Sequence, residues 1–398
     1  MNVCVVAEYY PRRRDPASGV WAHEQARAAR DAGADVRVLA LERPVPPMRA
    51  LRSPATLAGS LRAIATQPRR EVRDGIPVEY VRYVAPPRGR SYDAWGDWAR
   101  RPLERALANL ERDWPIDVVH AHYAVPGGAA ARAWVAAHDK PLVVSVHGSD
   151  VYAQLLATEK GRAEVARVFG AAEVVLCNSR ETSRRAAEIG GGPERMRVVH
   201  LGARTPSEIP EKHSRPTVAT LAADLVPRKR HEDVLRALDD ERLSEVEWVV
   251  FGAGSERPRL ERLARELGID GRIRWTGRLD HEATLRELAR CHVMALPSVD
   301  EAFGVAYVEA LACGVPVVAV RGEGGPEEIA EHVEGVSLVP ARDPDALADT
   351  LSRLLSDRAE LARLSTAARA GAKAQFSWSR TGAETVRAYE DALQMKPK

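Results

Sequence analysis

The 398-residue sequence predicts an α/β protein made of two doubly wound domains, each built on a mainly parallel sheet. First, the chain is longer than one hydrophobic core usually organises. Second, short unbroken apolar runs alternate with stretches of helical periodicity, which is typical of parallel strands covered on both faces. Third, this alternation stops over residues 203–216 and restarts at residue 217. We therefore expect two domains that face each other across a cleft at the carboxyl ends of their strands.

The first half begins with the apolar run at residues 3–11, which we interpret as a buried strand and not as a signal peptide. Apolar residues at helical spacing follow from Val20 to Ala32, and Gly33 ends that helix. Further buried strands are predicted, in order, at residues 36–41, 117–122, 142–148, 173–179 and 196–202. This half, residues 1–205, is predicted to be the N-terminal, acceptor-binding domain.

The polar segment Ala203–Pro216 contains three prolines and no periodicity, so it is predicted to link the domains. Strands are then expected at residues 217–223, 246–255, 272–277, 292–298, 315–320 and 335–340. Residues 206–378 form the predicted C-terminal domain. The remaining segment, 379–398, is expected to belong to a last helix, with its periodic stretch at Trp378–Leu393, that packs back on the N-terminal domain.

Composition excludes several classes of protein. With 45% hydrophobic and 29% charged residues, the chain is typical of a soluble globular protein, and no apolar run approaches the roughly 20 residues of a membrane helix. Cysteines without a Cys-x-x-Cys pair argue for a reducing, cytoplasmic compartment and against a zinc cluster. The four are Cys4, Cys177, Cys291 and Cys313.

The net charge of +2 hides a basic first half and an acidic second half. This asymmetry fits ordinary surface variation best, and it also fits an acidic acceptor or an anionic surface such as the inner face of a membrane. Basic residues are dispersed and no recognition motif is present, so nucleic acid is not an expected partner.

The segment at 297–314, PSVDEAFGVAYVEALACG, carries the strongest chemical pattern. A strand ends before it, Gly304 permits a sharp turn, and a helix is expected from about Val305. Glu301 lies in the loop and Glu309 lies one turn inside the helix. Carboxylates accept hydrogen bonds from sugar and ribose hydroxyls, and a helix start suits a diphosphate. Alternatively, both glutamates are solvated charges around a helix start.

This segment resembles the Glu-(seven residues)-Glu motif of the family-4 retaining glycosyltransferases, which have the GT-B fold. The resemblance extends over nearly the whole chain. It implies that Glu301 contacts the donor sugar and that Glu309 contacts the nucleotide ribose. It also implies that Phe303, Gly304 and Val305 offer backbone amides to the donor.

Two other segments of the second half follow the family's order. Gly277-Arg278-Leu279 is where the family usually holds the nucleobase, so Arg278 and Leu279 are expected at the donor. GEGGPEEI at 322–329 resembles the family's Gly-Gly-x-x-Glu-Ile turn.

The stretch at 223–238 matches the family's phosphate-binding segment, with Lys229 on the lysine that neutralises the donor phosphates. However, Asp224 occupies the usual arginine position and Arg230 the glycine position. Three explanations stay open: Arg228 or Arg230 substitutes for the arginine, Asp224 points away, or the donor is unusual.

In the first half, the stretch at 15–33 resembles the family's glycine loop and first helix, so Gly19 is expected to approach the donor sugar and phosphates. VSVHGSDVY at 144–152 resembles the family's His-Gly-Ser/Thr-Asp element and places His147 near the reacting sugar. Asp150 either contacts the acceptor or caps the next helix.

The HAHYAVPGG segment at 120–128 resembles the family's strand end and Pro-Gly turn before a helix, which implies that His122 or Tyr123 lies near the acceptor. His120-x-His122 could also serve as a metal pair, but no third ligand is near in sequence. Residues 12–14 and Pro86–Arg101, with Trp95 and Trp98, are further acceptor-side candidates or simply solvated loops.

The resemblance implies retaining transfer of a hexose-type sugar from a nucleotide-sugar donor to an acceptor hydroxyl. Catalytic roles fall on His147, Lys229 and Glu301, with the nucleotide-sugar as co-substrate and no metal or other cofactor. The acceptor is a small molecule, a lipid-linked sugar or a polysaccharide. Two alternatives are a nucleotide-sugar epimerase of the same fold and a non-catalytic nucleotide-sugar binder.

Overall fold

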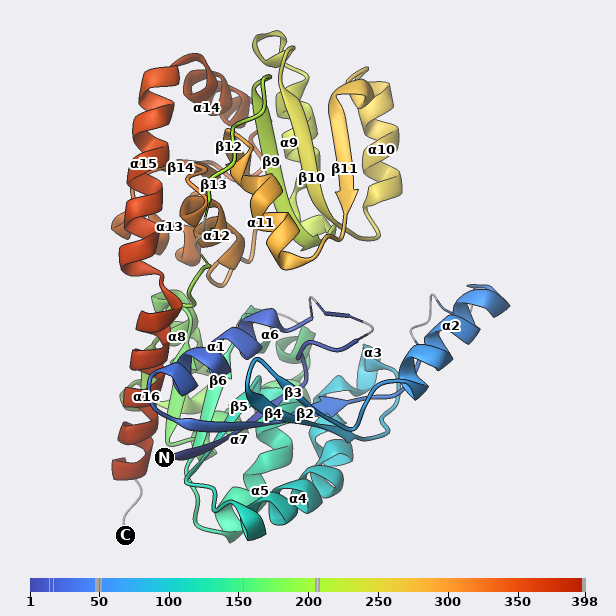
Figure 1. Ribbon diagram of the computed structural model, residues 1–398, viewed down its shortest axis with the longest axis vertical. Coiled ribbons are helices and arrows are strands. Elements are labelled where there is room, and N and C mark those ends of the chain that lie inside the picture. Colours follow the sequence, from blue (N-terminus) through green and yellow to red (C-terminus); the bar gives the residue numbers. More distant parts are fainter. Residues whose placement is uncertain are drawn as a thin grey trace. The chain divides into compact units, whose positions relative to one another are not determined.

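The computed structural model describes residues 1–13, 15–16, 18–46, 50, 52–152, 154–204, 206 and 208–395. The chain forms two compact units, each with its own sheet and helices (Figure 1). The N-terminal unit comprises Met1–His200 together with Trp378–Lys398, and the C-terminal unit comprises Leu201–Ser377. The first division therefore lies five residues before the sequence boundary at 205, and the second lies one residue before the boundary at 378.

The N-terminal unit contains an eight-stranded sheet in the order β3-β4-β2-β1-β5-β6-β7-β8. Its strands are β1 Asn2–Ala7, β2 Asp35–Glu42, β3 Arg70–Arg73, β4 Ile76–Arg82, β5 Val118–His122, β6 Leu142–Val146, β7 Val174–Cys177 and β8 Met196–Val198. Central strands such as β5 and β6 are buried along their whole length, because helices cover both faces.

One edge of this sheet departs from the sequence prediction. Strand β3 pairs antiparallel with β4, whereas only strands typical of a parallel sheet were expected. Asp74 and Gly75 form the turn, with φ of 45° and 80°. An Asp-Gly pair between two alternating segments is a strong hairpin signal, because both residues tolerate positive φ. The hairpin was therefore readable from the sequence.

Helices of the N-terminal unit are α1 Val20–Asp31, α2 Pro54–Ala65, α3 Arg88–Ser91, α4 Trp95–Asp113, α5 Ala129–Ala137, α6 Ser149–Tyr152, α7 Glu159–Ala171, α8 Arg180–Ala186 and α16 Trp378–Met395. The last of these returns from the C-terminal unit and packs on α1 (Figure 1). Gln25 Nε2 donates to Thr385 Oγ1 at 3.1 Å, and a Cβ at Gly382 would lie 2.2 Å from the Ala28 carbonyl oxygen. The α16 helix is thus part of the N-terminal core.

The C-terminal unit contains a six-stranded parallel sheet in the order β11-β10-β9-β12-β13-β14. Its strands are β9 Thr217–Asp224, β10 Glu247–Ala253, β11 Ile273–Gly277, β12 Val293–Ala295, β13 Val317–Val320 and β14 Val336–Val339. Its helices are α9 His231–Leu238, α10 Arg257–Glu266, α11 His281–Ala289, α12 Val305–Ala312, α13 Gly324–His332, α14 Pro344–Ser356 and α15 Arg358–Gln375.

Strand order reverses at β9, which lies between β10 and β12. Open α/β sheets bind ligands beyond the carboxyl ends of the strands at such a switch point, because the connecting loops diverge there. The loops that leave β9 and β12 are the segments after Asp224 and after Ala295. The topology therefore brings the two chemically richest segments of the sequence to one edge.

None of the helices within the described residues combines the length and the apolar character that crossing a bilayer requires.

Candidate functional site

The loop that follows β12 carries a buried ion pair. Glu301 Oε2 accepts hydrogen bonds from Lys229 Nζ at 2.6 Å and from Ser298 Oγ at 2.8 Å. Ser298 Oγ also lies 2.9 Å from the hydroxyl of Tyr307, which donates to the Leu296 carbonyl oxygen. Only 14% of the Lys229 side chain and 10% of the Glu301 side chain are exposed. Two residues 72 positions apart in sequence therefore form one polar centre.

Electrostatics keep Glu301 ionised. Burial opposes its charge, but the Lys229 ammonium, the Arg228 guanidinium and the Ser298 hydroxyl outweigh burial and hold the pKa of Glu301 below its usual value. Arg228 contributes from 3.9 Å. All these contacts are to Oε2, and among the described residues Oε1 accepts no hydrogen bond. Glu301 thus presents a charged oxygen that can accept a ligand hydroxyl.

The start of α12 depends on two glycines. Gly304 is the N-cap at φ 92°, and a Cβ there would lie 2.1 Å from the Tyr307 ring. A Cβ at Gly325 would meet the Phe303 backbone at 2.4 Å. The turn at 322–329 therefore packs directly on the loop at 301–304, as close backbone approach requires. Phe303 itself is buried, with its ring 5.7 Å from that of Phe376.

Glu323 reinforces this loop and was not identified from the sequence. Its Oε2 accepts the backbone N–H of Glu301 at 2.8 Å. Burial raises the pKa of Glu323, while that backbone contact and another from Asp300 oppose the rise. The sequence feature that could have identified Glu323 is its position immediately before the Gly-Gly turn, where a carboxylate can accept hydrogen bonds from exposed backbone amides.

Glu309 is held by a histidine that was also missed. His281 Nε2 lies 2.7 Å from Glu309 Oε1, and 16% of the Glu309 side chain is exposed. His281 is the first residue of α11 and comes two residues after Leu279. Its position just behind the predicted nucleobase loop was the available signal.

Asp224 is paired within the protein. Its carboxylate forms an ion pair with Arg278, which joins the end of β9 to the loop after β11. Arg230 turns toward α9, where it contacts Asp233 through two hydrogen bonds of 2.9 and 2.6 Å. Arg228 instead lies beside Glu301. The family usually has an arginine at the position of Asp224. The geometry favours Arg228 over Arg230 as its substitute.

In the N-terminal unit, three histidines line up across the ends of β5 and β6. His147 Nε2 lies 2.8 Å from His122 Nδ1, and their rings stack 5.0 Å apart at an angle of 7°. His120 Nδ1 lies 2.7 Å from the Tyr389 hydroxyl and Nε2 lies 2.8 Å from Ser145 Oγ. Burial lowers the pKa of His120 and of His147 to about 3, and the pKa of His122 falls well below its usual value. All three are therefore neutral at pH 7.

The structure separates the N-terminal candidates by exposure. His122 is fully buried, so it has no surface to offer an acceptor. Asp150 is also buried and accepts the backbone N–H groups of Ala124 at 2.9 Å and His147 at 3.2 Å. Burial raises the pKa of Asp150 to about 7 despite these bonds. The position of Asp150 therefore favours a structural role, in which its carboxylate joins the loop at Ala124 to the loop at His147. Tyr123 lies beside His147, with ring centroids 4.9 Å apart.

The structure also shows the surroundings of Gly19 and of the segments predicted to lie on the acceptor side. Gly19 has φ 67°, and a Cβ there would meet the Tyr9 carbonyl oxygen at 2.1 Å, so the glycine loop packs on the segment that follows β1. Arg88 lies over the Tyr92 ring at 3.9 Å. Trp95 is buried, whereas Trp98 is half exposed. In the predicted basic loop at 12–14, residue 14 lies outside the described residues.

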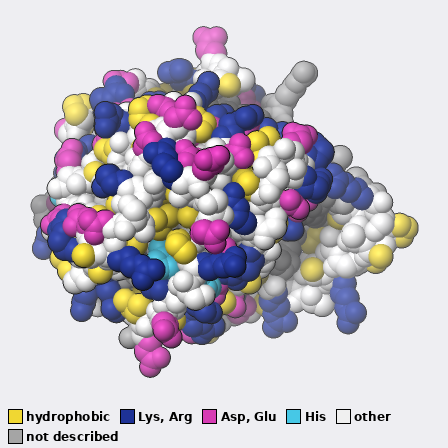
Figure 2. Space-filling view, turned by 90° about the horizontal axis from the view of Figure 1, so that it is seen from above, with side chains coloured by type: hydrophobic (Ala, Val, Ile, Leu, Met, Phe, Trp, Pro, Cys, Tyr) yellow, Lys and Arg dark blue, Asp and Glu magenta, His cyan; other side chains and the backbone are white. Residues whose placement is uncertain are grey.

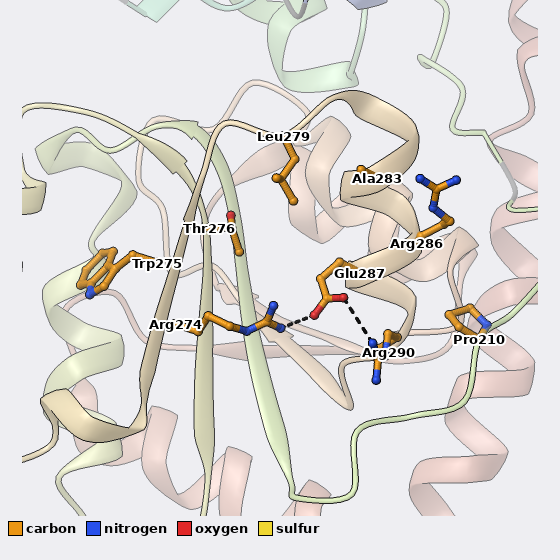
Figure 3. Close-up of a pocket in the computed structure, with 9 residues that line it drawn as sticks. All are labelled: Pro210, Arg274, Trp275, Thr276, Leu279, Ala283, Arg286, Glu287 and Arg290. Atoms are coloured by element: carbon orange, nitrogen blue, oxygen red, sulfur yellow. Dashed lines mark hydrogen bonds and ion pairs between the residues drawn. The ribbon is translucent and has the colours of Figure 1, made fainter.

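A separate hollow of about 680 Å³ lies beside β11 and α11 (Figure 3). Glu287 at its centre contacts Arg274 and lies 3.8 Å from Arg290. Leu279 contributes to the wall, but Lys229, Glu301 and Glu309 do not. This hollow is therefore distinct from the polar centre around Glu301.

Surface charge is mixed on the face shown in Figure 2. Basic side chains alternate with acidic and hydrophobic ones among the described residues there, without a continuous basic patch. Within the described part of the chain, no group of three or more His, Cys, Asp or Glu residues is arranged to hold a metal ion.

Comparison with known proteins identifies the family. Residues 18–205 match the family Glycosyltransferase Family 4, and residues 205–371 match Glycosyl transferases group 1. The D-inositol 3-phosphate glycosyltransferase of Xylanimonas cellulosilytica is 32% identical over 322 residues, which cover 74% of this chain and 76% of that protein.

Two solved structures share the fold. Sucrose-phosphate synthase from Thermosynechococcus elongatus superposes with a TM-score of 0.77 at 19% identity, covering 98% of both chains. Anabaena Alr3699/HepE, solved in complex with UDP and glucose, gives a TM-score of 0.70 at 20% identity, covering 97% of this chain and 98% of that one. The two sheets, the polar edge at Glu301 and these matches agree: this chain is a glycosyltransferase that belongs to family 4 and has the GT-B fold.

Proposed function

We propose that this glycosyltransferase moves a hexose-type sugar from a nucleotide-sugar donor to an acceptor hydroxyl, with retention of configuration and without a metal. The observation that carries the proposal is the Lys229–Glu301 pair beside the start of α12. It places an ammonium and an ionised carboxylate at one sheet edge, and a nucleotide-sugar offers a diphosphate and sugar hydroxyls to match them. The solved complex of the structural neighbour HepE with UDP and glucose supports this class of donor.

Each part of the donor has a partner of suitable chemistry. The free Oε1 of Glu301 accepts a hydroxyl of the donor sugar, and Glu309 accepts from the ribose. Backbone amides of Phe303, Gly304 and Val305 bind phosphate oxygens at the helix start. The loop of Arg278 and Leu279 holds the base, as in the family that the sequence resembles.

Departure of the nucleoside diphosphate breaks the bond between the anomeric carbon and a phosphate oxygen. Lys229, Arg228 and the start of α12 stabilise the negative charge that develops on that oxygen. The acceptor oxygen then bonds to the anomeric carbon from the same face, and the acceptor proton passes to the departing phosphate. His147 donates a hydrogen bond to the reacting sugar.

The acceptor is proposed to bind the N-terminal unit. It is a small molecule, a lipid-linked sugar or a polysaccharide. The name of the Xylanimonas relative, which cites D-inositol 3-phosphate, supports a small phosphorylated acceptor. The basic first half of the chain fits such an anionic ligand.

A thermal-shift screen with UDP-, GDP-, ADP- and dTDP-sugars tests the donor. One nucleotide class should raise Tm, because a ligand that binds only the folded state at about 100 times its Kd adds about 2.7 kcal/mol of stability. Glu309→Ala should lose the shift. His147→Ala should keep the shift and slow transfer. Absence of a shift with every donor contradicts the proposal.

Turnover assays complete the test. Transfer should persist in the presence of EDTA, and it should require an acceptor. A product formed from the donor alone would instead indicate an epimerase, and binding without turnover for every acceptor class would indicate a non-catalytic binder.

A further inference from the structure

One hydrogen bond joins the rings of His122 and His147. Their facing nitrogens, Nδ1 of His122 and Nε2 of His147, lie 2.8 Å apart. Both rings are neutral at pH 7, because burial lowers both pKa values. A neutral imidazole has one N–H donor and one bare acceptor nitrogen. One ring must therefore donate across this contact, and the choice fixes the tautomer of both rings.

The far nitrogen of His122 distinguishes the two arrangements. His122 Nε2 is buried and has no hydrogen-bond partner within the described residues. If His147 donated, His122 would accept on Nδ1 and would carry its own hydrogen on Nε2, as a buried donor without a partner. Orphaned buried N–H groups are the rarer defect, and each costs about 1–3 kcal/mol. If His122 donates from Nδ1, its buried Nε2 carries no hydrogen, so no N–H group is left without a partner.

His120 cannot take the place of either partner. Its Nδ1 is bound to Tyr389 and its Nε2 to Ser145, so both nitrogens are occupied. Its ring centroid lies 4.6 Å from that of His122. His120 therefore fixes the position of the His122 ring by packing, while the hydrogen-bonding choice stays between His122 and His147.

We infer that His122 is a positioning residue that donates from Nδ1 to His147 Nε2 and so holds His147 as the Nδ1–H tautomer. His147 is only partly buried, and its Nδ1 is not among the buried unpartnered atoms of the described residues. The Nδ1–H group is therefore available as a hydrogen-bond donor for an oxygen of the substrate. The identity of that oxygen rests on the proposed function, whereas the tautomer does not.

This arrangement also defines what His147 does not do. Its Nε2 is occupied as an acceptor and its Nδ1 is already protonated, so the ring has no free basic nitrogen. His147 therefore does not take the acceptor proton during transfer, and its contribution is one donated hydrogen bond. Sequence reasoning had placed His122 at the acceptor, but its burial and this contact assign it to His147 instead.

Nitrogen-15 NMR of the histidine rings in the full-length protein tests the tautomer directly. The spectrum of a His147→Gln variant identifies the His147 signals by their loss. His138 is an internal reference, because its Nδ1 faces the Trp134 carbonyl oxygen at 2.9 Å and must carry hydrogen there. His147 at neutral pH should show a protonated Nδ1 and a bare Nε2. An Nε2–H pattern overturns the inference.

Two variants of His122 test the positioning role. His122→Asn retains an N–H donor close to the position of Nδ1, whereas His122→Leu fills the space without a donor. The Leu variant should lower kcat about tenfold or more with little change in the donor KM, and Asn should recover most of that loss. A folded Leu variant with full kcat, or an Asn variant that is folded yet as slow as Leu, contradicts the role. If Leu does not fold, the Asn variant and the NMR spectrum decide.

Failure of the inference is distinguishable from failure of the proposed function. If His147→Gln keeps full kcat while the wild-type ring shows Nδ1–H, the tautomer stands and the role of His147 in transfer is wrong. His138→Asn serves as the matched control and should leave kcat and KM unchanged.

Discussion

At the scale of single residues, Lys229 has two functions that can be separated. It neutralises the buried Glu301 at 2.6 Å, and we propose that it also binds the donor phosphates. Lys229→Met should weaken donor binding about 10- to 100-fold, the worth of a charged hydrogen bond. It should also destabilise the fold by about 3 kcal/mol, because the buried Glu301 carboxylate loses its shortest ion pair and keeps only Ser298 and the more distant Arg228.

The double variant Lys229→Met/Glu301→Gln should recover stability in urea denaturation but not donor affinity in calorimetry. Lys373→Met, at an exposed lysine of α15, is the control and should change neither quantity. If the double variant binds donor like the wild type, Lys229 has no role at the phosphates.

Substitution of Asp224 should strengthen donor binding, whereas substitution of Lys229 should weaken it. The exposed Asp224 carboxylate holds Arg278 in an ion pair at the proposed donor edge. Asp224→Asn removes a negative charge near the expected diphosphate and releases Arg278 from that pair. We expect donor affinity to rise about two- to fivefold, since exposed pairs are worth at most about 1 kcal/mol. Asp349→Asn, at a residue of α14 whose carboxylate pairs with Arg242, is the control. A tenfold loss of affinity in Asp224→Asn would instead show that the carboxylate binds the donor.

At the scale of elements, the start of α12 carries the backbone amides that we propose bind the donor. Gly304→Ala combines an unfavourable positive φ with a clash against Tyr307. Gly322→Ala is the matched control, because φ is 85° there but nothing lies within 4 Å of the added Cβ. Both variants should lose about 1 kcal/mol of stability from φ. Only Gly304→Ala should lose donor affinity, about tenfold or more, in the same binding assay. Equal donor binding by both variants would contradict the placement of the diphosphate at this helix.

At the scale of the whole molecule, histidines whose pKa values are lowered by the fold make stability depend on pH. His120 and His147 have a pKa of about 3 in the folded state against 6.5 in the unfolded chain. The unfolded state therefore binds more protons between these values, so stability is complete above 6.5 and falls as pH drops toward 3. Each histidine contributes a slope of about 1.4 kcal/mol per pH unit. Asp150, whose pKa is raised to about 7, opposes this slope.

Urea denaturation at a series of pH values measures this slope. His120→Asn retains a group for the Tyr389 hydroxyl and removes one titrating ring, so its slope should be shallower by about 1.4 kcal/mol per pH unit. An unchanged slope would mean that His120 is already protonated in the folded protein.

Local chemistry explains why most elements were predictable. Strands such as 142–146 and helices such as α1 follow from side-chain periodicity, which depends only on neighbouring residues. The spacing of Glu301 and Glu309 is local in the same sense. The signal for the Asp74-Gly75 hairpin also lies in neighbouring residues, but this turn was not identified from the sequence.

By itself, the sequence determined the two α/β domains, the loop-to-helix segment at Glu301 and the resemblance to family 4. Tertiary structure decided the partners: Lys229 with Glu301, Asp224 with Arg278, His281 with Glu309 and His122 with His147. The physical reason is that these contacts join residues far apart in the chain. Their distances depend on strand order and on the direction in which each loop leaves its strand. Periodicity specifies neither of these.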